Sequence, residues 1–467
     1  MKLPKKPVMT WGSDLKRRDF LRGTSAASLL TLMGGVPILA ADSAAPAPAA
    51  EKKTGRPPLQ VAVIGLGLQG RDILTALSKM PSAKVAAICD TYEPMVKRCK
   101  ELAPEADTNP DYKKVLENKA IQAVVIATPT HKHREIVEAA LAAGKHVYCE
   151  VPLAWSLEDA RAIAQAAKKS PRSNFQTGLQ KRADPQNYKL IEFIRSGAAG
   201  TILKARAQWA KKTSGRRTSP NPDREKDLNW RLYQETSLGL IGEMGIHQVD
   251  LLSWFLKAKP KSVYGFGNVA LYNSNKDNDD RTAFDTVQAL FEFPNKVGFY
   301  YDATLGNSYE SEYEVLHGTD AAVVTRGSKA WMFKEADAPL LGWEVYAKKE
   351  EGVAYKEAGI SLAANATKIV TVKVEELPYA ITSLATAMES FVRNSVVLGQ
   401  EVTNFDDAFD PKDEKALREY LADTLKKVRL PAAGWQEAYE ATVMVIKANE
   451  ATIKGERITY SKEWFEV

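Results

Sequence analysis

The sequence predicts an α/β protein whose N-terminal part is a Rossmann domain with a doubly wound parallel sheet. A strand-like apolar run leads directly into a Gly-x-Gly-x-x-Gly turn and then into a helical pattern. Strand-like and helix-like segments then alternate through residues 58–178. Such alternation is typical of parallel sheets, in which ligands bind beyond the carboxyl ends of the strands.

The turn lies in the stretch LQVAVIGLGLQG, whose three glycines have separate physical roles. Gly65 permits a tight turn, Gly67 lets the backbone approach a diphosphate, and Gly70 lets the helix pack closely on the strand. Leu68 and Gln69 in the same turn are also expected to contact the cofactor, because the N-terminus of the helix that follows would direct amide hydrogens and a positive dipole end toward phosphates. The pattern predicts a dinucleotide site, against the alternative of a plain strand-turn-helix unit.

The next strand, AKVAAICD, ends in Asp90, twenty residues after Gly70. A carboxylate at this place can hold the ribose 2′-hydroxyl and would repel a 2′-phosphate, so the sequence favours NAD over NADP. Because ligands lie past the strand ends, the following units place five more residues around the nicotinamide: Thr128, Pro129, His133, Glu150 and Pro152.

The N-terminus reads LKRRDFLRGTSAASLLTLMGGVPILA, a basic region followed by a weakly apolar stretch. The stretch is too short and too rich in Gly, Ser and Thr for a comfortable membrane span. Arg17 and Arg18 before Asp-Phe-Leu resemble a twin-arginine signal. We therefore predict a signal peptide over 1–41, a linker over 42–57 and recognition by the twin-arginine export machinery. The expected location is periplasmic or extracellular, with no integral membrane span after signal removal. The alternative is an ordinary basic N-terminus.

The composition argues against several classes of protein. An apolar fraction of 45% argues against disorder, and the net charge of +6 comes from basic residues scattered among acids, which disfavours a nucleic-acid partner. The cluster KKTSGRRTSPNPDREK (211–226) is interpreted as a solvated loop rather than a phosphate-binding patch. Three cysteines do not indicate a disulfide framework, and five histidines without paired spacing near carboxylates predict no metal site.

A second cluster of candidate residues lies in GLIGEMGIHQVDLLSWFL, whose apolar spacing predicts a helix. Glu243 and His247 are four residues apart and are expected to share a face of that helix. A carboxylate beside an imidazole orients it and raises its basicity, so His247 is a candidate general base for a hydroxyl proton. Asp250 is expected to hold His247 from the next turn. The alternative is a structural His–Asp pair.

Three blocks resemble the Gfo/Idh/MocA family, named after glucose-fructose oxidoreductase and inositol dehydrogenase. They are ATPTHKHREIVEAALAAGKHVYCEVPL, GLQKRADPQNYKLIEFIRSGAAGTI and the helical block around His247. The resemblance implies a Rossmann domain over 58–178 and, over 179–467, an α/β domain with an open, mostly antiparallel sheet. It also implies a small-molecule carbohydrate substrate, hydride transfer between nicotinamide and a sugar or cyclitol carbinol, and assembly into a homo-oligomer.

The chain departs from the family pattern at two positions. The family often has Asp where Glu243 lies, and it has Glu-Lys-Pro where this chain has Glu-Val151-Pro. The resemblance assigns that lysine to a hydrogen bond with the reacting hydroxyl, which valine cannot make. Lys181, Arg182, Tyr300 and Tyr301 are candidates to assist instead. The residues predicted to contact the carbohydrate are Gln180, Arg182, Trp230 and Tyr300.

Taken together, these features predict an exported NAD(P)-dependent oxidoreductase acting on CH–OH groups of a carbohydrate. Because free NAD is scarce outside the cytoplasm, the cofactor is expected to stay tightly bound. A first alternative is an NAD-dependent glycoside hydrolase that oxidises, eliminates and reduces, similar to the family's α-N-acetylgalactosaminidase branch. A second alternative is a ligand-binding protein without catalysis.

Overall fold

The computed structural model describes residues 57–219, 221–273, 279–327, 329–338 and 382–467. The predicted signal peptide (1–41) and all but the last residue of the predicted linker (42–57) lie outside these residues. Within the described part of the chain, no helix combines the length and apolar character needed to cross a membrane.

The first sheet has six parallel strands in the order β3-β2-β1-β4-β5-β6, which is the doubly wound arrangement that the sequence predicts. Apolar strand side chains such as Val61, Val63 and Val125 are fully buried and form its core. The strands are β1 (Leu59–Ile64), β2 (Ala83–Cys89), β3 (Asp107–Thr108), β4 (Ala123–Ile126), β5 (His146–Cys149) and β6 (Phe175–Thr177). The helices of this domain are α3 (Leu68–Leu77), α4 (Glu93–Lys100), α5 (Tyr112–Glu117), α6 (His133–Ala142) and α7 (Leu157–Lys168).

The second sheet has eight strands in the order β13-β12-β11-β7-β10-β9-β8-β14, and only the pair β7 and β10 is parallel. An open, mostly antiparallel second sheet is therefore confirmed. Its strands are β7 (Ile202–Ala210), β8 (Ser262–Asn268), β9 (Thr286–Glu292), β10 (Gly298–Thr304), β11 (Glu312–Gly318), β12 (Ala321–Arg326), β13 (Lys329–Lys334) and β14 (Arg457–Thr459).

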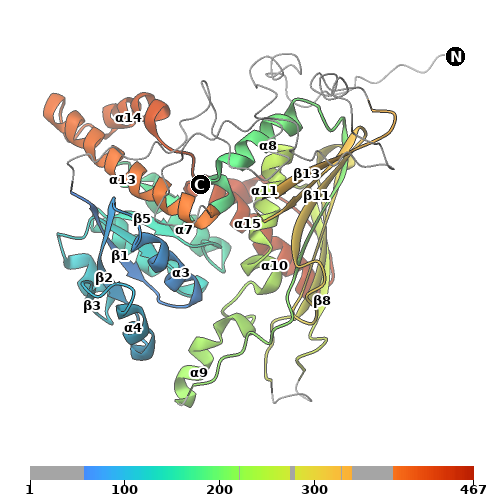
Figure 1. Ribbon diagram of the computed structural model, residues 1–467, viewed down its shortest axis with the longest axis horizontal. Coiled ribbons are helices and arrows are strands. Elements are labelled where there is room, and N and C mark those ends of the chain that lie inside the picture. Colours follow the sequence, from blue (N-terminus) through green and yellow to red (C-terminus); the bar gives the residue numbers. More distant parts are fainter. Residues whose placement is uncertain (1–56, 220, 274–278, 328, 339–381) are drawn as a thin grey trace, which may run out of the picture.

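Helices cover the inner face of the second sheet and separate it from the Rossmann domain. Figure 1 shows α10 (Gly239–Glu243), α11 (Ile246–Leu256) and α15 (Trp435–Lys454) in this middle layer, with α8 (Pro185–Arg195) above them. Side chains alternate along each strand, so Phe299 and Tyr301 of β10 are buried on the inner face.

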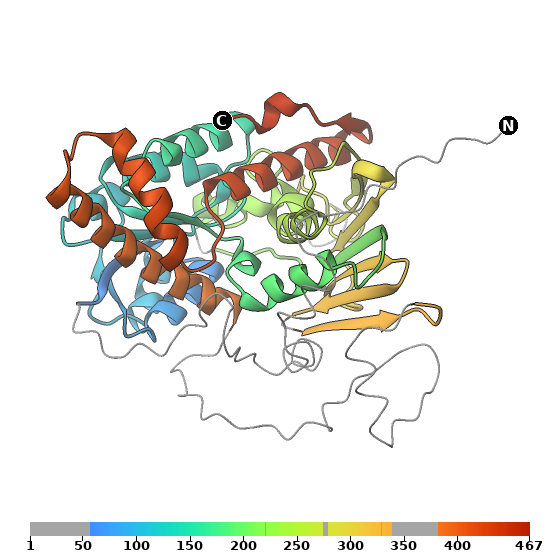
Figure 2. The same cartoon turned by 90° about the horizontal axis from the view of Figure 1, so that it is seen from above.

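The C-terminal part of the chain packs on both sheets. Helix α13 (Ser383–Ala408) returns to the Rossmann domain, where its Met388 and Phe391 join the core that contains Val61 (Figure 2). Helix α14 (Glu414–Val428) packs on α13 through Leu417 and Leu421, and α15 packs on β8 and α7. Residues 396–434, whose role the sequence does not indicate, therefore form the second half of α13, the helix α14 and the loop into α15.

Candidate active site

The glycine turn between β1 and α3 is closely packed at two of its glycines and open at the third. A Cβ on Gly65, whose φ is +92°, would lie 2.6 Å from the carbonyl carbon of Ala127. A Cβ on Gly70 would lie 1.9 Å from the Gly65 carbonyl oxygen, so the helix approaches the strand as closely as backbone allows. A Cβ on Gly67 would meet nothing within 4 Å. The turn thus has the tight bend, the close packing and the open approach that a diphosphate needs.

Two buried polar atoms beside the turn have no partner among the described residues. They are the Nε of Arg71, in the first turn of α3, and the Oγ1 of Thr128, just after β4. Buried donors are normally satisfied, so atoms left free at a strand end indicate a place for a polar ligand. Together with the open face of Gly67, they fit the phosphates and the nicotinamide end of a dinucleotide.

Asp90 lies at the end of β2, as predicted, and is partly exposed. Its two oxygens accept hydrogen bonds from the backbone amides of Leu66 (2.7 Å) and Tyr92 (2.8 Å). These bonds tie the glycine turn to the loop after β2. A carboxylate has further lone pairs, so Asp90 can still accept a ribose hydroxyl.

Glu150 lies buried at the end of β5 and is linked to the glycine turn. Its Oε1 accepts a hydrogen bond from Gln69 Nε2 at 2.9 Å, and burial raises the pKa of the carboxyl to about 7. Its carboxyl also packs on Gly178, where a Cβ would lie 2.1 Å from Oε2. Tyr148 contacts both Glu150 and Gln180, which connects the end of the first sheet to the segment that enters the second domain.

His133 is buried beneath the loops that follow β4 and β5, and its side chain does not face open space. Its Nδ1 lies 3.0 Å from the Pro152 carbonyl oxygen, and its Nε2 lies 3.1 Å from the Thr128 carbonyl oxygen. The ring thereby joins the loop of Thr128 and Pro129 to the loop of Pro152. Burial lowers the pKa of His133 to about 4, so the imidazole is neutral near neutral pH.

The expectation that Glu243 and His247 share one helix face is wrong. The chain forms two helices here, and Glu243 ends α10 whereas His247 lies in the first turn of α11. Gly245 lies between the helices because a Cβ there would come within 2.5 Å of the Ile241 carbonyl oxygen. The Glu243 carboxylate instead accepts a hydrogen bond from Thr130 Oγ1 at 3.1 Å, which joins the second domain to the loop after β4.

Asp250 does not hold His247, which is the role expected for it. Its carboxylate forms an ion pair with Arg182, with Nε 2.9 Å from Oδ2 and Nη2 2.9 Å from Oδ1. The Arg182 guanidinium also lies 4.9 Å from the centre of the Trp254 ring. No hydrogen bond between Asp250 and His247 occurs in the part of the chain that the structure describes.

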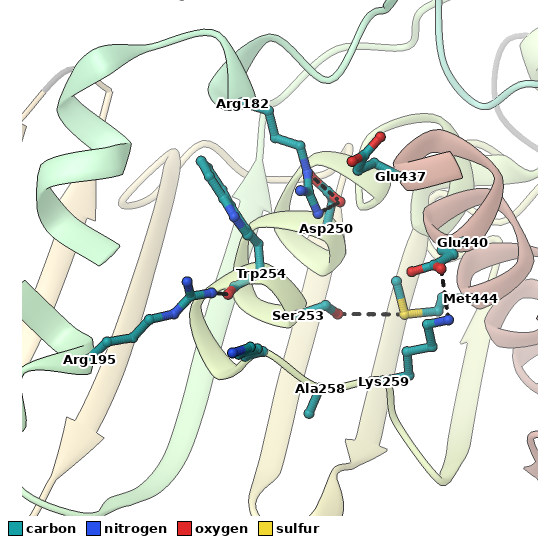
Figure 3. Close-up of a pocket in the computed structure, with 11 residues that line it drawn as sticks. Arg182, Arg195, Asp250, Ser253, Trp254, Ala258, Lys259, Glu437, Glu440 and Met444 are labelled. Carbon is teal, nitrogen blue, oxygen red and sulfur yellow. Dashed lines mark hydrogen bonds and ion pairs between the residues drawn. The ribbon is translucent and has the colours of Figure 1, made fainter. Parts of the chain in front are cut away.

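Arg182 and Asp250 line a pocket along one side of α11, between α8 and α15 (Figure 3). The charged groups drawn there are largely engaged with neighbours: Arg195 binds the Trp254 carbonyl oxygen at 2.7 Å, and Lys259 pairs with Glu440 at 2.8 Å. Neither His247 nor the glycine turn contributes to its lining. We interpret Arg182 and Asp250 as part of the framework that holds α11 in place.

His247 has a different set of neighbours from those predicted. Burial and the positive charge of Lys181 together lower its pKa to about 4, and the negative charge of Glu314 opposes both effects. The ring nevertheless keeps some contact with solvent. The His247 side chain forms no hydrogen bond with another described residue, so its ring nitrogens are available to a ligand.

Lys181 lies in the short helix η2 (Gln180–Arg182) and reaches the inner face of the second sheet. Its Nζ lies 2.5 Å from Glu314 Oε1 and 3.3 Å from Glu312 Oε1. Burial disfavours its charge, but the two carboxylates outweigh burial and raise its pKa. Gln248, next to His247, donates to the same Glu312 carboxylate at 2.9 Å. A protonated lysine and a neutral histidine are therefore neighbours in one site.

The sequence reasoning missed Thr130, Glu312 and Glu314. The two glutamates stand at alternate positions in SEYEVLHG, a spacing that places them on one face of a strand. Nothing in the sequence indicates that this face would meet Lys181, which lies more than 130 residues earlier in the chain. These carboxylates belong to the site only through the fold.

Two residues predicted to contact the carbohydrate lie elsewhere. Tyr300 points to the outer face of the second sheet, beside Arg206 and opposite Leu290, because its neighbour Tyr301 takes the inner position. Trp230 is buried and packs edge-on against His131. Of the four predicted contacts, Gln180 lies directly beside Lys181, and Arg182 pairs with Asp250 as described above.

No group of three or more His, Cys, Asp or Glu side chains suited to a metal ion occurs among the residues that the structure describes. All three cysteines are buried as free thiols.

Comparison with known proteins identifies the family. The family model described as "Oxidoreductase family, NAD-binding Rossmann fold" matches residues 59–178, and the model described as "GFO/IDH/MocA C-terminal domain" matches residues 188–324. The two ranges together exceed half of the chain.

Curated relatives are similar over part of their length. The "Uncharacterized oxidoreductase YrbE" of Bacillus subtilis is 28% identical over 267 residues, which are 57% of this chain and 71% of that protein. The "Inositol 2-dehydrogenase" of Salmonella typhimurium is 27% identical over 207 residues, which are 44% of this chain and 56% of that protein. The "Levoglucosan dehydrogenase" of Pseudarthrobacter phenanthrenivorans is 27% identical over 57% of this chain and 73% of its own.

Solved structures share the fold at low sequence identity. A levoglucosan dehydrogenase in complex with NADH superposes with a TM-score of 0.60 at 18% identity, over 87% of this chain and 100% of that chain. The aldose-aldose oxidoreductase of Caulobacter crescentus superposes with a TM-score of 0.59 at 16% identity, over 86% of this chain and 100% of that chain. The chain belongs to the Gfo/Idh/MocA family of NAD-binding oxidoreductases, and its relatives include an inositol dehydrogenase and a levoglucosan dehydrogenase.

Proposed function

We propose that the protein transfers hydride between a nicotinamide cofactor and a CH–OH carbon of a sugar or cyclitol. The observation that carries the proposal is the pairing of a neutral His247 with a protonated Lys181, on a chain whose first domain binds NAD in its family. Inositol 2-dehydrogenase and levoglucosan dehydrogenase among the relatives support the substrate class.

Each of the two side chains has a distinct role in this reaction. His247, with a pKa of about 4, is unprotonated at neutral pH and takes the proton of the reacting hydroxyl. Lys181 directs its remaining hydrogen toward the same oxygen and stabilises the negative charge that develops there. NAD bound at the glycine turn supplies the hydride acceptor. Burial of the site limits water around the reacting oxygen, which strengthens both interactions.

Lys181 offers a physical answer to the loss of the family lysine. Val151 is buried with 8% of its surface exposed and carries no polar group. Lys181 comes from η2, next to Gln180, and is held by Glu312 and Glu314. The Lys181 ammonium group follows β6, whereas Val151 follows β5. It can thus reach the inner face of the second sheet beside His247.

For the cofactor we propose NAD, because Asp90 lies where a 2′-phosphate would meet its negative charge. Export by the twin-arginine pathway, a periplasmic or extracellular location and tight cofactor binding remain parts of this proposal. They are supported by the sequence of residues 1–41.

We also propose that the protein forms a homo-oligomer through the outer face of the second sheet. Large apolar side chains on this face are exposed, and Tyr264 and Leu290 stand opposite each other on neighbouring strands. Others on exposed positions of the sheet are Leu203, Phe266, Trp331 and Phe333. Exposed apolar side chains such as Tyr264, Phe266 and Leu290, gathered on the neighbouring strands β8 and β9, are typical of protein–protein contacts.

A second candidate function is glycoside cleavage by oxidation, elimination and reduction. The observation that favours it is Val151, which resembles the motif of the family's hydrolytic branch. The two reactions differ in their net product, because cleavage returns the hydride to the sugar and leaves no net NADH.

The experiment that tests the proposal is an assay of NADH formation with a panel of cyclitols, aldoses and anhydrosugars. His247→Ala should lower kcat by roughly 100-fold to 10,000-fold, which is the usual loss for a general base. Lys181→Met should lower kcat while the affinity for NADH stays unchanged. The matched controls are His317→Ala and Lys204→Ala, on β11 and β7 of the same sheet.

Wild-type turnover in His247→Ala would contradict the catalytic assignment and favour a ligand-binding protein. Release of an aglycone from a glycoside without net NADH would favour the hydrolytic reaction instead.

A further inference from the structure

A segment of the second domain crosses to the dinucleotide site. This crossing segment, residues 211–219 and 221–232, contains α9 (Pro222–Leu228). Figure 1 shows α9 at the foot of the molecule, beside α4 of the Rossmann domain. Arg224 on α9 donates to the Thr91 hydroxyl at 2.9 Å, and its guanidinium lies 5.8 Å from the centre of the Tyr92 ring. Thr91 and Tyr92 directly follow Asp90, so α9 is attached at the ribose end of the site.

The crossing segment is also fixed to its own domain. Arg216 pairs with Asp280 at 2.9 Å and with Glu225 at 3.4 Å. Asn229 is 2% exposed, and its side chain accepts from the Arg217 amide at 2.7 Å and donates to the Arg217 carbonyl oxygen at 2.8 Å. The backbone of Arg217 is therefore held in both directions while its side chain is left out of these bonds.

The side chain of Arg217 lies among other arginines and has no acidic partner in the described residues. Burial lowers its pKa, and the pKa is lowered further by the positive charges of Arg231, Arg71 and Arg98. These three neighbours mark different parts of the dinucleotide site. Arg71 follows Gly70 and has a buried Nε without a partner, Arg98 lies on α4, and Arg231 faces Glu243 and Glu150 near the nicotinamide end.

Arg231 is compensated by Glu243, whereas Arg217 has no carboxylate within ion-pair distance among the described residues, so a bound anion would relieve its repulsion from the neighbouring arginines. We propose that the crossing segment forms the outer wall of the dinucleotide site and that Arg217 binds the diphosphate opposite the open face of Gly67. Arg217 is within electrostatic range of Arg71 and Arg98 on the Rossmann domain and of Arg231 on its own domain. Arginine binds phosphate oxygens through two parallel hydrogen bonds, which suits this place.

The crossing segment gives a structural reason for slow release of the cofactor. A dinucleotide on the glycine turn alone is open to solvent on one side. With Arg217 and α9 across it, release requires breaking the Arg224–Thr91 contact as well as the phosphate bonds. Arg217, which lies in the cluster 211–226 that the sequence indicates is a solvated loop, is thereby assigned to phosphate binding. The proposal rests on the dinucleotide site of the proposed function but not on its reaction.

The test is NADH binding to the full chain, measured by fluorescence titration and by the rate of release in a stopped-flow instrument. In Arg217→Met, which keeps the apolar stem, affinity for NADH, NADPH and ADP-ribose should fall by roughly 10-fold to 100-fold, as for loss of a charge-assisted hydrogen bond. Affinity for adenosine, which lacks phosphate, should not change. The matched control is Lys211→Ala, which removes a positive charge from an exposed position on the same segment.

Thermal unfolding of both variants, expected to match the wild type, checks that the protein remains folded. Unchanged NADH affinity in Arg217→Met would overturn the proposal, as would the absence of dinucleotide binding by the wild type. A loss confined to NADPH would also overturn it, because Arg217 would then contact a 2′-phosphate rather than the diphosphate. A protein that binds NADH through Arg217 but oxidises no carbohydrate would overturn the proposed function alone.

Discussion

The dinucleotide half and the proposed carbohydrate half of the site are stabilised by different means. At the glycine turn, backbone packs directly on backbone, since Gly70 lies against the carbonyl oxygen of Gly65. Around His247 the structure depends on buried charges, namely Lys181 with Glu314 and Arg182 with Asp250. The first half is thus sensitive to added volume, whereas the second is sensitive to unbalanced charge.

The largest expected effect comes from breaking a buried ion pair in the second half. Asp250→Asn leaves the Arg182 guanidinium uncompensated at a site where the Asp250 side chain is 4% exposed. We expect the free energy of unfolding to fall by about 3–5 kcal/mol, measured by urea denaturation. The double variant Asp250→Asn with Arg182→Met removes both charges and should recover much of that loss. Equal losses in the single and double variants would show that burial of charge is not the cause.

A smaller effect is expected from added volume in the first half. Gly70→Ala places a methyl group against the Gly65 carbonyl oxygen, and we expect it to lower the free energy of unfolding by about 1–3 kcal/mol. Gly67→Ala is the matched control for stability, because its methyl group meets nothing. It should fold normally and still weaken NADH binding by at least roughly 10-fold, since the methyl group occupies the approach of the diphosphate. Normal NADH binding in Gly67→Ala would contradict the placement of the phosphates.

The smallest expected effect is that of mild acid on activity. Because burial lowers the pKa of His247 to about 4, the imidazole loses its function only as pH falls toward that value. We expect kcat/KM at pH 5 to be close to its value at pH 7, whereas a histidine of ordinary pKa would lose roughly 30-fold. A decline centred near pH 6.5 would show that His247 is more exposed during turnover than in this structure.

The fold of the first half could be predicted because its determinants are local. The glycine spacing and the strand after it lie within about thirty residues, and each glycine has the packing role that the pattern predicts. The second half could not be predicted in the same way. Glu243 and His247 have helical spacing, but the break at Gly245 separates them, and only the close approach of Ile241 reveals why.

The faces of the second sheet show a further limit of sequence reasoning. Alternation along β10 predicts that Tyr300 and Tyr301 point in opposite directions, but not which of them points inward. That choice depends on which face of the sheet α10 and α15 cover. No local sequence pattern records this face. The same holds for Lys181, whose ion-pair partner Glu314 comes from a distant strand. It also holds for Arg217, whose neighbours Arg71 and Arg98 belong to the other domain.

The return of α13 to the first sheet has a consequence for the order in which the protein is made. Met388 and Phe391 belong to the core of the Rossmann domain, although they follow its last strand by about two hundred residues. During synthesis, the surface that they cover stays exposed until nearly the whole chain has left the ribosome. The nucleotide-binding half therefore becomes complete only when the carbohydrate half already exists, so an unfinished chain cannot present a finished cofactor site.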